Sequence, residues 1–379
     1  MNDKPNDSTD VDAANARLEE FRKKIDAIDR RLIDAINERA ELVVDIGKLK
    51  RDAGIPIYAP HREAAVLEKV RGLNKGPIHN RTIEAVYREL MSGSFALEQP
   101  LRIGYLGPTG TYSHLAATRH FGSSVSFEDL RAIEGVFEEV SREHVDYGLV
   151  PIENSTGGGI TETLDAFLTY HDKVNIYGEV QLVVHFCLLA NCKPTEIKRI
   201  YSKSEAFLQC RNWLITQFPQ VELIPSGSTA AAVRHAKEDN ESSDTRGSAA
   251  IGSSLAGEIH GMHPLFEKIE DRQSNVTRFL VLSKSETEIS GDDKTSIMFT
   301  TDDRPGSLVD VLNVFKRASI NLSHIDKRPS KVENWDYTFF VDTLGHAKDA
   351  KFAEVVGEAR AYCKMLTVLG SFPRCKRSL

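Results

Sequence analysis

Residues 17–50 read RLEEFRKKIDAIDRRLIDAINERAELVVDIGKLK, and their pattern decides the fold of the first part of the chain. Apolar side chains recur here with heptad spacing, and no proline follows Arg17 before Pro56. The pattern predicts one helix of about 34 residues, about 50 Å long, with two shorter helices around residues 61–72 and 79–98. Because about 90 residues cannot bury so long an apolar seam, the sequence also predicts a helical homodimer. The seam contains Leu18, Phe21, Ile25, Ile28, Leu32, Ala35, Leu42, Ile46 and Leu49.

Several polar residues lie on or beside this predicted seam. Arg39 occupies a seam position where leucine or isoleucine would be expected, and Arg22 and Lys50 share one heptad position beside it. In the third predicted helix, Ser94 and Glu98 accompany the apolar face. A buried cation without a partner is costly, so the helices are expected to enclose an anion or a carboxylate. The alternative is that these groups are rim charges or internal salt bridges.

Composition narrows the class of protein. The 379 residues exceed one ordinary core, which predicts two or three domains. A net charge of −7 argues against nucleic acid or an anionic membrane as a partner, and no apolar run approaches a membrane span. The longest such run, residues 183–190, is interpreted as one buried strand. The five cysteines form no C-x-x-C pair, so neither zinc nor a disulfide framework is expected, and the polar residues 1–16 are interpreted as a disordered tail on a cytoplasmic protein.

The middle of the chain, from residue 101 to 284, has a different periodicity. Short apolar strands, such as residues 102–106, are each followed by a small-residue turn and an amphipathic helix, which is an α/β pattern. Glycine-rich turns at residues 107–113 and 153–159 follow two of these strands, and such turns point backbone amides at an anion. Because no nucleotide-binding motif occurs, the pair of turns favours a cleft for a small carboxylate; the alternative is ordinary loop geometry.

The last part of the chain follows a linker at residues 290–293. Its expected order is strand, helix, strand, strand, helix, strand, which is a ferredoxin-like α+β unit. The expected strands are residues 296–300, 322–328, 337–342 and 366–372, and the expected helices are residues 305–318 and 351–364.

Residues 17–98 resemble the all-helical chorismate mutases. The resemblance rests on LEEFRKKID (18–26), NERAEL (37–42), IGKLK (46–50) and HRE (61–63). Chorismate rearranges to prephenate in a pericyclic reaction, which requires a pocket that holds a dianion in its reactive shape rather than a nucleophile. The resemblance implies that Arg39 and the Arg22 side chain of a second subunit bind the carboxylates, and that Lys50 binds the ether oxygen.

The same resemblance assigns further residues of this pocket. Glu63 is expected to bind the substrate hydroxyl, with Arg62 and Ser94 in support, and Glu98 faces the ether oxygen. Two positions depart from the family pattern: Ala59 stands where many relatives have an acidic residue, and Glu98 stands where some have glutamine. A carboxylate facing the ether oxygen assists only when it is protonated.

Residues 100–285 resemble prephenate dehydratase, whose fold is similar to the two-lobed periplasmic binding proteins. The signature stretches correspond to GPTGTYS (107–113), PIENS (151–155) and NVTRF (275–279). The reaction expels water and carbon dioxide to leave an aromatic ring, so a proton delivered to the departing hydroxyl is its main demand. The resemblance implies that Thr277 positions or supplies that proton and that Phe279 shapes the pocket. The substrate carboxylates would be held by Thr111, Ser113, Asn154 and Ser155.

Two further points concern this region. From the residues alone Thr277 is an ordinary strand threonine, and only the resemblance gives it a catalytic role. In YSKSE (201–205), Lys203 lies where relatives commonly show Ser-His-Pro, so this loop departs from the family pattern.

The stretch DDRPGSLV (302–309), at a predicted strand-to-helix turn, resembles an ACT domain, a small regulatory module that binds amino acids at dimer interfaces. The alternative is a ferredoxin-like domain used only for dimerisation. HIDKRP (324–329) is similar to a family motif that usually contains Glu-Ser-Arg-Pro. The resemblance implies a phenylalanine effector site formed by Gly306, Ser307, Leu308, Asp326 and Arg328.

Together the three resemblances imply a bifunctional enzyme with an all-α domain at 17–99, an α/β domain at 100–285 and an α+β domain at 294–375. It is expected to convert chorismate to prephenate and then to phenylpyruvate in L-phenylalanine biosynthesis, to be inhibited by phenylalanine, and to need no metal or organic cofactor. Two alternatives remain. One is a ligand-binding regulator without catalysis, and the other is an oxidative enzyme of tyrosine biosynthesis, which is disfavoured because a nicotinamide fingerprint is missing.

Overall fold

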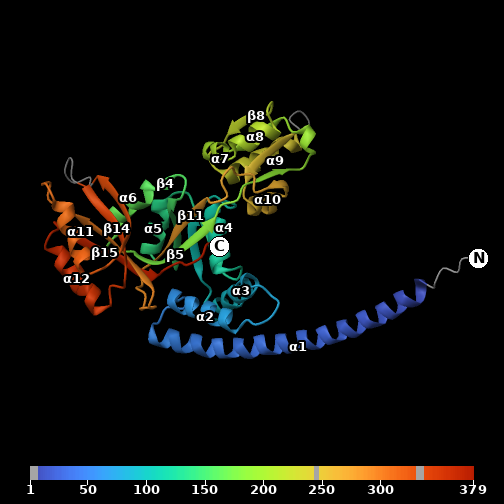
Figure 1. Cartoon of the computed structure of the whole chain (residues 1–379), viewed down its shortest axis with the longest axis horizontal. Helices are drawn as coiled ribbons and strands as arrows, with labels where there is room; N and C mark the ends of the chain where they lie inside the picture. The colour runs from blue at the N-terminus through green and yellow to red at the C-terminus, as the bar shows by residue number, and fades with distance from the viewer. Residues whose placement is uncertain (1–6, 243–246, 330–336) are drawn as a thin grey trace, which may run out of the picture.

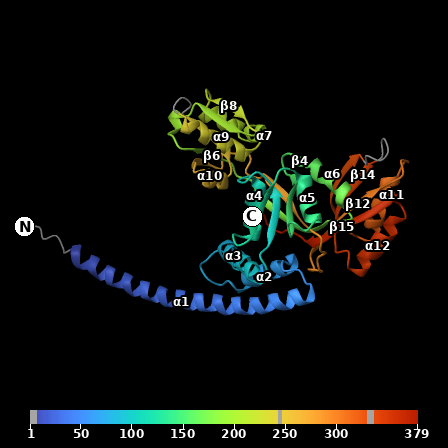
Figure 2. The same cartoon turned by 180° about the vertical axis from the view of Figure 1, so that it is seen from behind.

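The computed structural model describes residues 7–242, 247–329 and 337–379. Figure 1 shows three parts: a layer of helices that contains the long α1, a central α/β part with two lobes, and an antiparallel sheet with two helices at one end. Figure 2 shows from behind that the helical layer lies under the central part, and that one lobe stands away from the other two parts. The three-part fold class expected from the sequence is confirmed. None of the described helices is both long and apolar enough to cross a membrane.

The N-terminal part consists of α1 (Asp7–Ala53), α2 (Pro60–Leu73) and α3 (Asn80–Glu98). α1 has 47 residues and begins earlier than expected, so residues 7–16, which were assigned to a disordered tail, are helical. Extending an existing helix needs no new nucleus, and Ala13, Ala14 and Ala16 are strong helix formers, which explains the difference. Residues 1–6 of the expected tail lie outside the described residues.

The apolar seam of α1 is largely uncovered in the single chain. Leu18, Phe21, Ile25 and Leu32 are each at least half exposed. In Figure 1 this N-terminal half of α1 extends away from the rest of the molecule. Packing against α2 and α3 therefore does not account for the heptad pattern, and the homodimer stays a prediction.

The first lobe is a mixed sheet covered by helices. Its strand order is β2-β1-β3-β11-β5, with β4 paired to β3, and β11 is antiparallel to both of its neighbours. The strand β11 follows the second lobe in the sequence, and it lies between β3 and β5 of the first lobe. The lobe contains β1 (Arg102–Leu106), α4 (Tyr112–Phe121), β2 (Ser126–Leu130), α5 (Ile133–Ser141), β3 (Tyr147–Asn154), β4 (Gly158–Gly159), α6 (Thr161–Tyr170), β5 (Asn175–Val183) and β11 (Val276–Ser283).

The second lobe has its own sheet, with the order β10-β6-β9-β7-β8. The expected single strand over residues 183–190 is wrong, because β5 ends at Val183 and the next strand begins at Cys187. The residues between them cross from one lobe to the other. This lobe contains β6 (Cys187–Ala190), β7 (Arg199–Ser202), α7 (Ser204–Gln209), α8 (Arg211–Gln217), β8 (Glu222–Pro225), α9 (Thr229–Glu241), β9 (Ser248–Gly252), α10 (Ser254–His260) and β10 (His263–Glu267).

The two crossing segments are tied to each other. Glu270, on the return segment between β10 and β11, accepts a hydrogen bond from the Phe186 amide at 3.0 Å and lies 2.7 Å from the ring of His185. A carboxylate that is only 7% exposed is thus satisfied by the other crossing segment. The contact fixes the connection between the lobes.

The C-terminal part is a four-stranded antiparallel sheet with the order β13-β14-β12-β15. This order and the βαββαβ succession confirm the ferredoxin-like arrangement. Its elements are β12 (Asp293–Thr300), α11 (Ser307–Arg317), β13 (Leu322–Pro329), β14 (Tyr337–Leu344), α12 (Ala350–Arg360) and β15 (Met365–Pro373).

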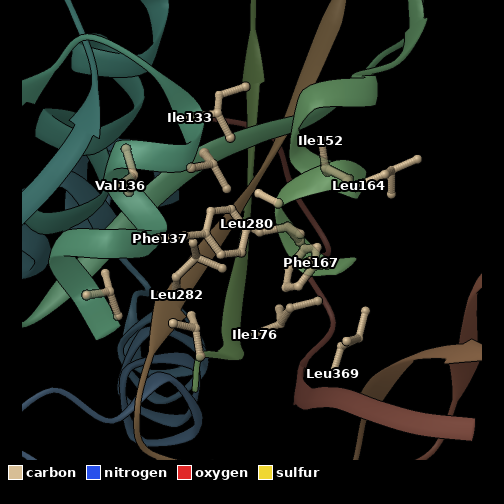
Figure 3. Close-up of a cluster of buried hydrophobic side chains, with 14 of the residues drawn as sticks. Ile133, Val136, Phe137, Ile152, Leu164, Phe167, Ile176, Leu280, Leu282 and Leu369 are labelled. Carbon is tan, nitrogen blue, oxygen red and sulfur yellow. The ribbon is translucent and has the colours of Figure 1, made fainter. Parts of the chain in front are cut away.

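The first lobe and the C-terminal sheet share one apolar core. Figure 3 shows Phe137, Phe167 and Leu280 of the first lobe together with Leu369 of β15. Met298 and Phe340, from β12 and β14, belong to the same buried cluster. Burial of this kind removes apolar surface from water on both sides, so the two parts are packed as one unit rather than joined by a linker alone.

The helical part is anchored to the first lobe by the segment between α1 and α2. Tyr58 is 2% exposed and packs against rings of the first lobe, including Phe121 and Tyr147. Its hydroxyl lies 2.7 Å from His120 Nε2, and its carbonyl accepts a hydrogen bond from the Tyr177 hydroxyl at 2.9 Å. The helical part therefore contributes to the core of the central part.

Candidate active sites

The junction of α1 and α3 brings together four of the predicted site residues. Lys50 Nζ lies 2.9 Å from Glu98 Oε2 and donates a second hydrogen bond to the Ile57 carbonyl at 2.8 Å. About three turns earlier on α1, Arg39 Nη1 donates to Ser94 Oγ at 2.9 Å. Ser94 and Glu98 are both buried, and each has a cationic side chain as a partner, Arg39 for Ser94 and Lys50 for Glu98. The arrangement presents two cations along the groove between two helices.

Two of the other residues assigned to this pocket are not brought to it by the single chain. Arg22 is exposed, pairs with Glu19, and lies about 25 Å from Arg39 along the helix axis. Arg62 is exposed on α2. A second chain would be required to bring Arg22 near an Arg39 and Lys50 pair.

Glu63 faces a different space. It lines a cavity of about 370 Å³ between α2, α4 and β5, together with Tyr58 and His120. Burial raises the pKa of Tyr58 well above its usual value, and the nearby Glu63 carboxylate raises it further. Ala59 is the N-cap residue of α2 and provides no side-chain cap. In this chain, Glu63 is thus separate from the Lys50 and Glu98 pair.

The end of β3 and the start of β11 form a polar centre where the first lobe meets the second. Asn154 and Thr277 are directly paired across the two strands, and Asn154 Nδ2 donates to Thr277 Oγ1 at 2.9 Å. The Asn154 side-chain oxygen accepts hydrogen bonds from the amides of Thr156 and Gly157. These bonds fix the orientation of Asn154. The Thr277 oxygen therefore accepts from Asn154, which leaves the hydroxyl proton free to point at a ligand.

Two residues that the sequence analysis did not assign complete this centre. Asn154 Nδ2 also donates to Asn275 at 2.8 Å, Asn275 Nδ2 donates to Gln209 at 2.6 Å, and Gln209 Nε2 donates to Thr156 at 3.2 Å. Because Gln209 ends α7 of the second lobe, this ring of amides and hydroxyls connects both lobes. Asn275 lies in the quoted NVTRF stretch, two residues before Thr277, whereas no motif marks Gln209.

The remaining cleft residues have structural partners. Ser155 Oγ donates to the Ser274 carbonyl and accepts from the Val276 amide, so it fastens the start of β11. Thr111 is the N-cap of α4, and Ser113 is buried in the first turn of that helix. Phe279 is 1% exposed within the core around Tyr58. The turn before α4 is closed from the second lobe by Ser253, whose hydroxyl donates to the Gly110 carbonyl at 2.8 Å.

A cavity of about 220 Å³ lies at the start of α11. It is lined by Gly306, Ser307 and Leu308 and by the rings of Tyr337 and Phe339. Gly306 has a φ of 88°, a left-handed conformation that favours glycine, and precedes the first turn of the helix. The Ser307 hydroxyl is buried and has no hydrogen-bond partner among the described residues. One unpaired hydroxyl and two aromatic rings thus lie at this cavity.

Asp326 and Arg328 do not line this cavity. The Arg328 guanidinium forms two hydrogen bonds with Asp165 of α6, at 2.6 and 2.9 Å, and Asp326 lies against Gly159. Within one chain, the two halves of the expected effector site are therefore apart.

Three family models match consecutive parts of the chain: chorismate mutase type II over residues 21–99, prephenate dehydratase over 103–287, and ACT domain over 295–360. The bifunctional chorismate mutase/prephenate dehydratase of Stutzerimonas stutzeri is 42% identical over 366 residues, which cover 94% of this chain and 98% of the relative. The chain belongs to the bifunctional chorismate mutase/prephenate dehydratase family.

Other relatives agree with this assignment. The bifunctional chorismate mutase/prephenate dehydratase of Aquifex aeolicus is 38% identical over 362 residues, covering 94% of this chain. Among solved structures, prephenate dehydratase from Arthrobacter aurescens in complex with L-Phe has a TM-score of 0.67 and 31% identity, and covers 74% of this chain and 92% of its own. The chain is thus a chorismate mutase and a prephenate dehydratase with an ACT domain.

The candidate sites of this bifunctional enzyme contain cations, amides and hydroxyl groups. In the described residues, no group of three or more His, Cys, Asp or Glu side chains is arranged to hold a metal ion. The departure at Lys203 falls at the N-cap of α7, where Lys203 pairs with Glu205 at 3.2 Å. It therefore lies on the helix that ends in Gln209.

Proposed function

We propose that this enzyme carries out two consecutive steps of L-phenylalanine biosynthesis in the cytoplasm, chorismate to prephenate and prephenate to phenylpyruvate, and that phenylalanine inhibits it. The observation that supports this most is the hydrogen-bonded ring of Asn154, Asn275, Gln209 and Thr156, which is joined to Thr277 through Asn154. It provides a polar centre in which Asn275 and Thr277 are buried and in which Thr277 has a hydroxyl proton to donate, which is what loss of the prephenate hydroxyl requires.

In the mutase site, Arg39 and Lys50 provide the positive charge for a dianion. The pericyclic step needs no nucleophile, so binding in the reactive shape and stabilisation of charge on the ether oxygen account for catalysis. Lys50 Nζ has one of its protons available beyond its bonds to Glu98 and Ile57. We assign the ether oxygen to Lys50 and the carboxylates to Arg39 and to Arg22 of a second chain, with Arg62, Glu63, Ser94 and Glu98 completing the site.

A homodimer through α1 follows from the same assignment. The exposed side chains of Leu18, Phe21 and Ile25 form an apolar stripe on the half of α1 that also carries Arg22. When two such stripes pack together, apolar surface is buried and each Arg22 reaches the groove of the other chain. The mutase site is complete only in that dimer.

In the dehydratase site, Thr277 donates a proton toward the departing hydroxyl while carbon dioxide leaves from the same ring. Asn154 fixes the Thr277 oxygen, and Ser155 holds the start of β11. Backbone amides at the start of α4, in the turn that contains Thr111 and Ser113, are placed for a substrate carboxylate. Phe279 supports the floor of the cleft from the core.

Feedback by phenylalanine is assigned to the ACT domain. The cavity at Gly306, Ser307 and Leu308 offers an unpaired hydroxyl for a charged end and the rings of Tyr337 and Phe339 for the side chain. Asp326 and Arg328, from a second chain or by displacement of β13, would complete it. The Arthrobacter relative in complex with L-Phe is consistent with this ligand.

The test is a coupled assay on the purified enzyme, with chorismate supplied and phenylpyruvate measured, in the presence and absence of phenylalanine. Arg39→Ala and Lys50→Ala are expected to lower mutase kcat/KM by about 100-fold or more while turnover of supplied prephenate stays within about twofold. Parallel loss of both activities would show that the two sites are not separate. Absence of phenylpyruvate from wild-type protein would exclude the proposed reaction sequence.

A further inference from the structure

The ACT sheet faces the dehydratase sheet directly behind the catalytic pair. Asn154 and Thr277 are cross-strand partners joined by a side-chain hydrogen bond, and the next pair along the same strands is Glu153 and Arg278. Because neighbouring residues of a strand point to opposite faces, Glu153 and Arg278 point to the face of the sheet opposite that of Asn154 and Thr277. On the ACT side, His324 and Asp342 are likewise cross-strand partners.

These two pairs meet. Arg278 Nη2 lies 2.6 Å from Asp342 Oδ2, and His324 Nδ1 lies 3.6 Å from Glu153 Oε2. Each member of the dehydratase pair is thus matched with one member of the ACT pair. Glu153 and Arg278, which follow the Asn154 and Thr277 pair toward the middle of the sheet, therefore both contact the regulatory domain through charged or ionisable groups.

The Arg278 contact is buried and charge-balanced. Arg278 also pairs with Glu179 of β5 at 2.8 Å, and Glu179 pairs with Lys294 of β12 at 3.1 Å. Burial lowers the pKa of Arg278, but the carboxylates of Asp342 and Glu179 outweigh it and hold this pKa above its usual value. The four charges sum to zero, and removal of one partner leaves an uncompensated charge in a dry environment.

The geometry of the pair is sensitive to the relative position of the sheets. Arg278 Nη2 and Asp342 Oδ2 lie 2.6 Å apart, and the other Asp342 oxygen accepts a hydrogen bond from the Ser296 hydroxyl of β12. The carboxylate is thus fixed within the ACT sheet, and its attraction to Arg278 changes when one sheet shifts against the other. Thr277 is the next residue on the same strand, so such a shift reaches it through one peptide unit.

We propose that Arg278 and Asp342 are positioning residues for Thr277, and that the ACT sheet, through Asp342 and His324, holds the Asn154 and Thr277 pair in its reactive orientation. The ACT domain is then part of the dehydratase machinery even without an effector. The proposal rests on the role of Thr277 proposed above and stands whether or not phenylalanine binds.

The experiment uses the full-length enzyme and substitutions in the ACT sheet, away from the cleft. Asp342→Asn is isosteric and removes the charge that faces Arg278. We expect dehydratase kcat to fall by about tenfold or more with KM changed by less than about threefold, because the groups that bind substrate remain. His324→Gln is expected to lower kcat by about threefold. Mutase activity of the same samples reports the folded fraction.

Two comparisons separate positioning from general destabilisation. Lys294→Met removes another cation of the same buried group without touching Asp342, and its kcat is expected to stay within about twofold of wild type. Arg278→Met combined with Asp342→Asn is expected to lose no more kcat than the worse single variant, since both act through one contact.

His324 is partly exposed, so His324→Gln gives a readout if Asp342→Asn does not fold. Unchanged kcat in His324→Gln and Asp342→Asn, or an equal loss in Lys294→Met, would overturn the proposal.

Discussion

At the scale of single residues, both candidate sites of this enzyme are built from polar groups that form hydrogen bonds or ion pairs with one another. Glu98 pairs with Lys50. Asn154 donates a hydrogen bond to Thr277, and the Asn154 side-chain oxygen accepts hydrogen bonds from two backbone amides. Such preorganisation means that little rearrangement is needed when charge develops in the transition state. Removal of one member therefore affects the chemistry and the orientation of its partner together.

Thr277→Ala tests the role of the hydroxyl. We expect dehydratase kcat to fall by about 100-fold or more, because the methyl group cannot donate a proton to the departing hydroxyl, while the mutase activity of the same sample is unchanged. Initial rates of phenylpyruvate formation from prephenate measure the effect. Activity retained within about tenfold, or ~1.4 kcal/mol of barrier, would exclude an essential role.

His120 gives the fold a predictable dependence on pH. Burial lowers its pKa, so the neutral ring is favoured in the folded state next to the Tyr58 hydroxyl. The unfolded chain binds a proton at a higher pH, so the contribution of His120 is complete above about pH 6.5 and is lost as the pH falls below that value. Urea unfolding between pH 7.5 and 5.5 should show a smaller loss of stability for His120→Gln than for wild type. An identical pH dependence of the unfolding free energy in the two proteins would contradict this.

At the scale of elements, the long helix α1 combines two tasks. Its C-terminal half packs against α3 and places Arg39 and Lys50, whereas its N-terminal half exposes an apolar stripe that carries Arg22. A stripe of this length on an isolated helix has no packing partner within the described chain. Oligomerisation and mutase activity should therefore change together.

Ile25→Glu places a charge in the middle of the stripe. We expect the dimer to dissociate and mutase kcat/KM to fall by about 100-fold, since Arg22 no longer reaches the second groove. Lys23→Gln, on the opposite side of α1, changes the net charge by the same amount and should preserve both properties. Analytical ultracentrifugation and the mutase assay decide the matter, and a fully active monomer would refute the shared site.

The elements themselves were predictable to different degrees. Heptad spacing gave α1, α2 and α3, and alternation with glycine-rich turns gave β1 and β3, because local pattern determines these elements. Residues 183–190 appeared to be one strand, since an apolar run does not reveal that its middle crosses between lobes. Gln209 carried no motif, because it reaches the cleft through the packing of α7. The facing pairs at Arg278 and His324 depend on how two sheets meet, which no local pattern encodes.

At the scale of the whole molecule, the three parts are interlocked rather than strung along the chain. The C-terminal residue Leu379 pairs with β5 through hydrogen bonds with Gln181 and Val183, and Arg377 pairs with Glu84 of α3. The segment that follows the ACT domain thus contacts both the dehydratase and the mutase parts. An effector that shifts the ACT sheet acts on elements that all three parts share.

Gly306→Val tests the effector site. A Cβ at this position meets nothing within 4 Å, so the restriction comes from the left-handed φ of 88°, which a β-branched residue adopts only with strain. We expect the first turn of α11 to change and the phenylalanine concentration for half-inhibition to rise by about tenfold or more, with basal turnover retained. Gly357→Val, in α12 at a position that is also open, is the control. Calorimetry that shows unaltered phenylalanine binding in Gly306→Val would place the effector elsewhere.

The position of β11 has a consequence for biosynthesis of the protein. This strand lies between β3 and β5 but follows the entire second lobe in the sequence. During translation, β3 and β5 are synthesised before β11, so the edges of both strands that face β11 stay unpaired until it is made. The second lobe is continuous in sequence and can assemble its own sheet in the meantime. The core that receives Tyr58 also contains Phe279 and Val281, so the mutase helices obtain their final support only when β11 has been made. A nascent chain interrupted within the second lobe therefore exposes open strand edges and an undocked helical layer together, and aggregation of such fragments is the expected fate of incomplete synthesis.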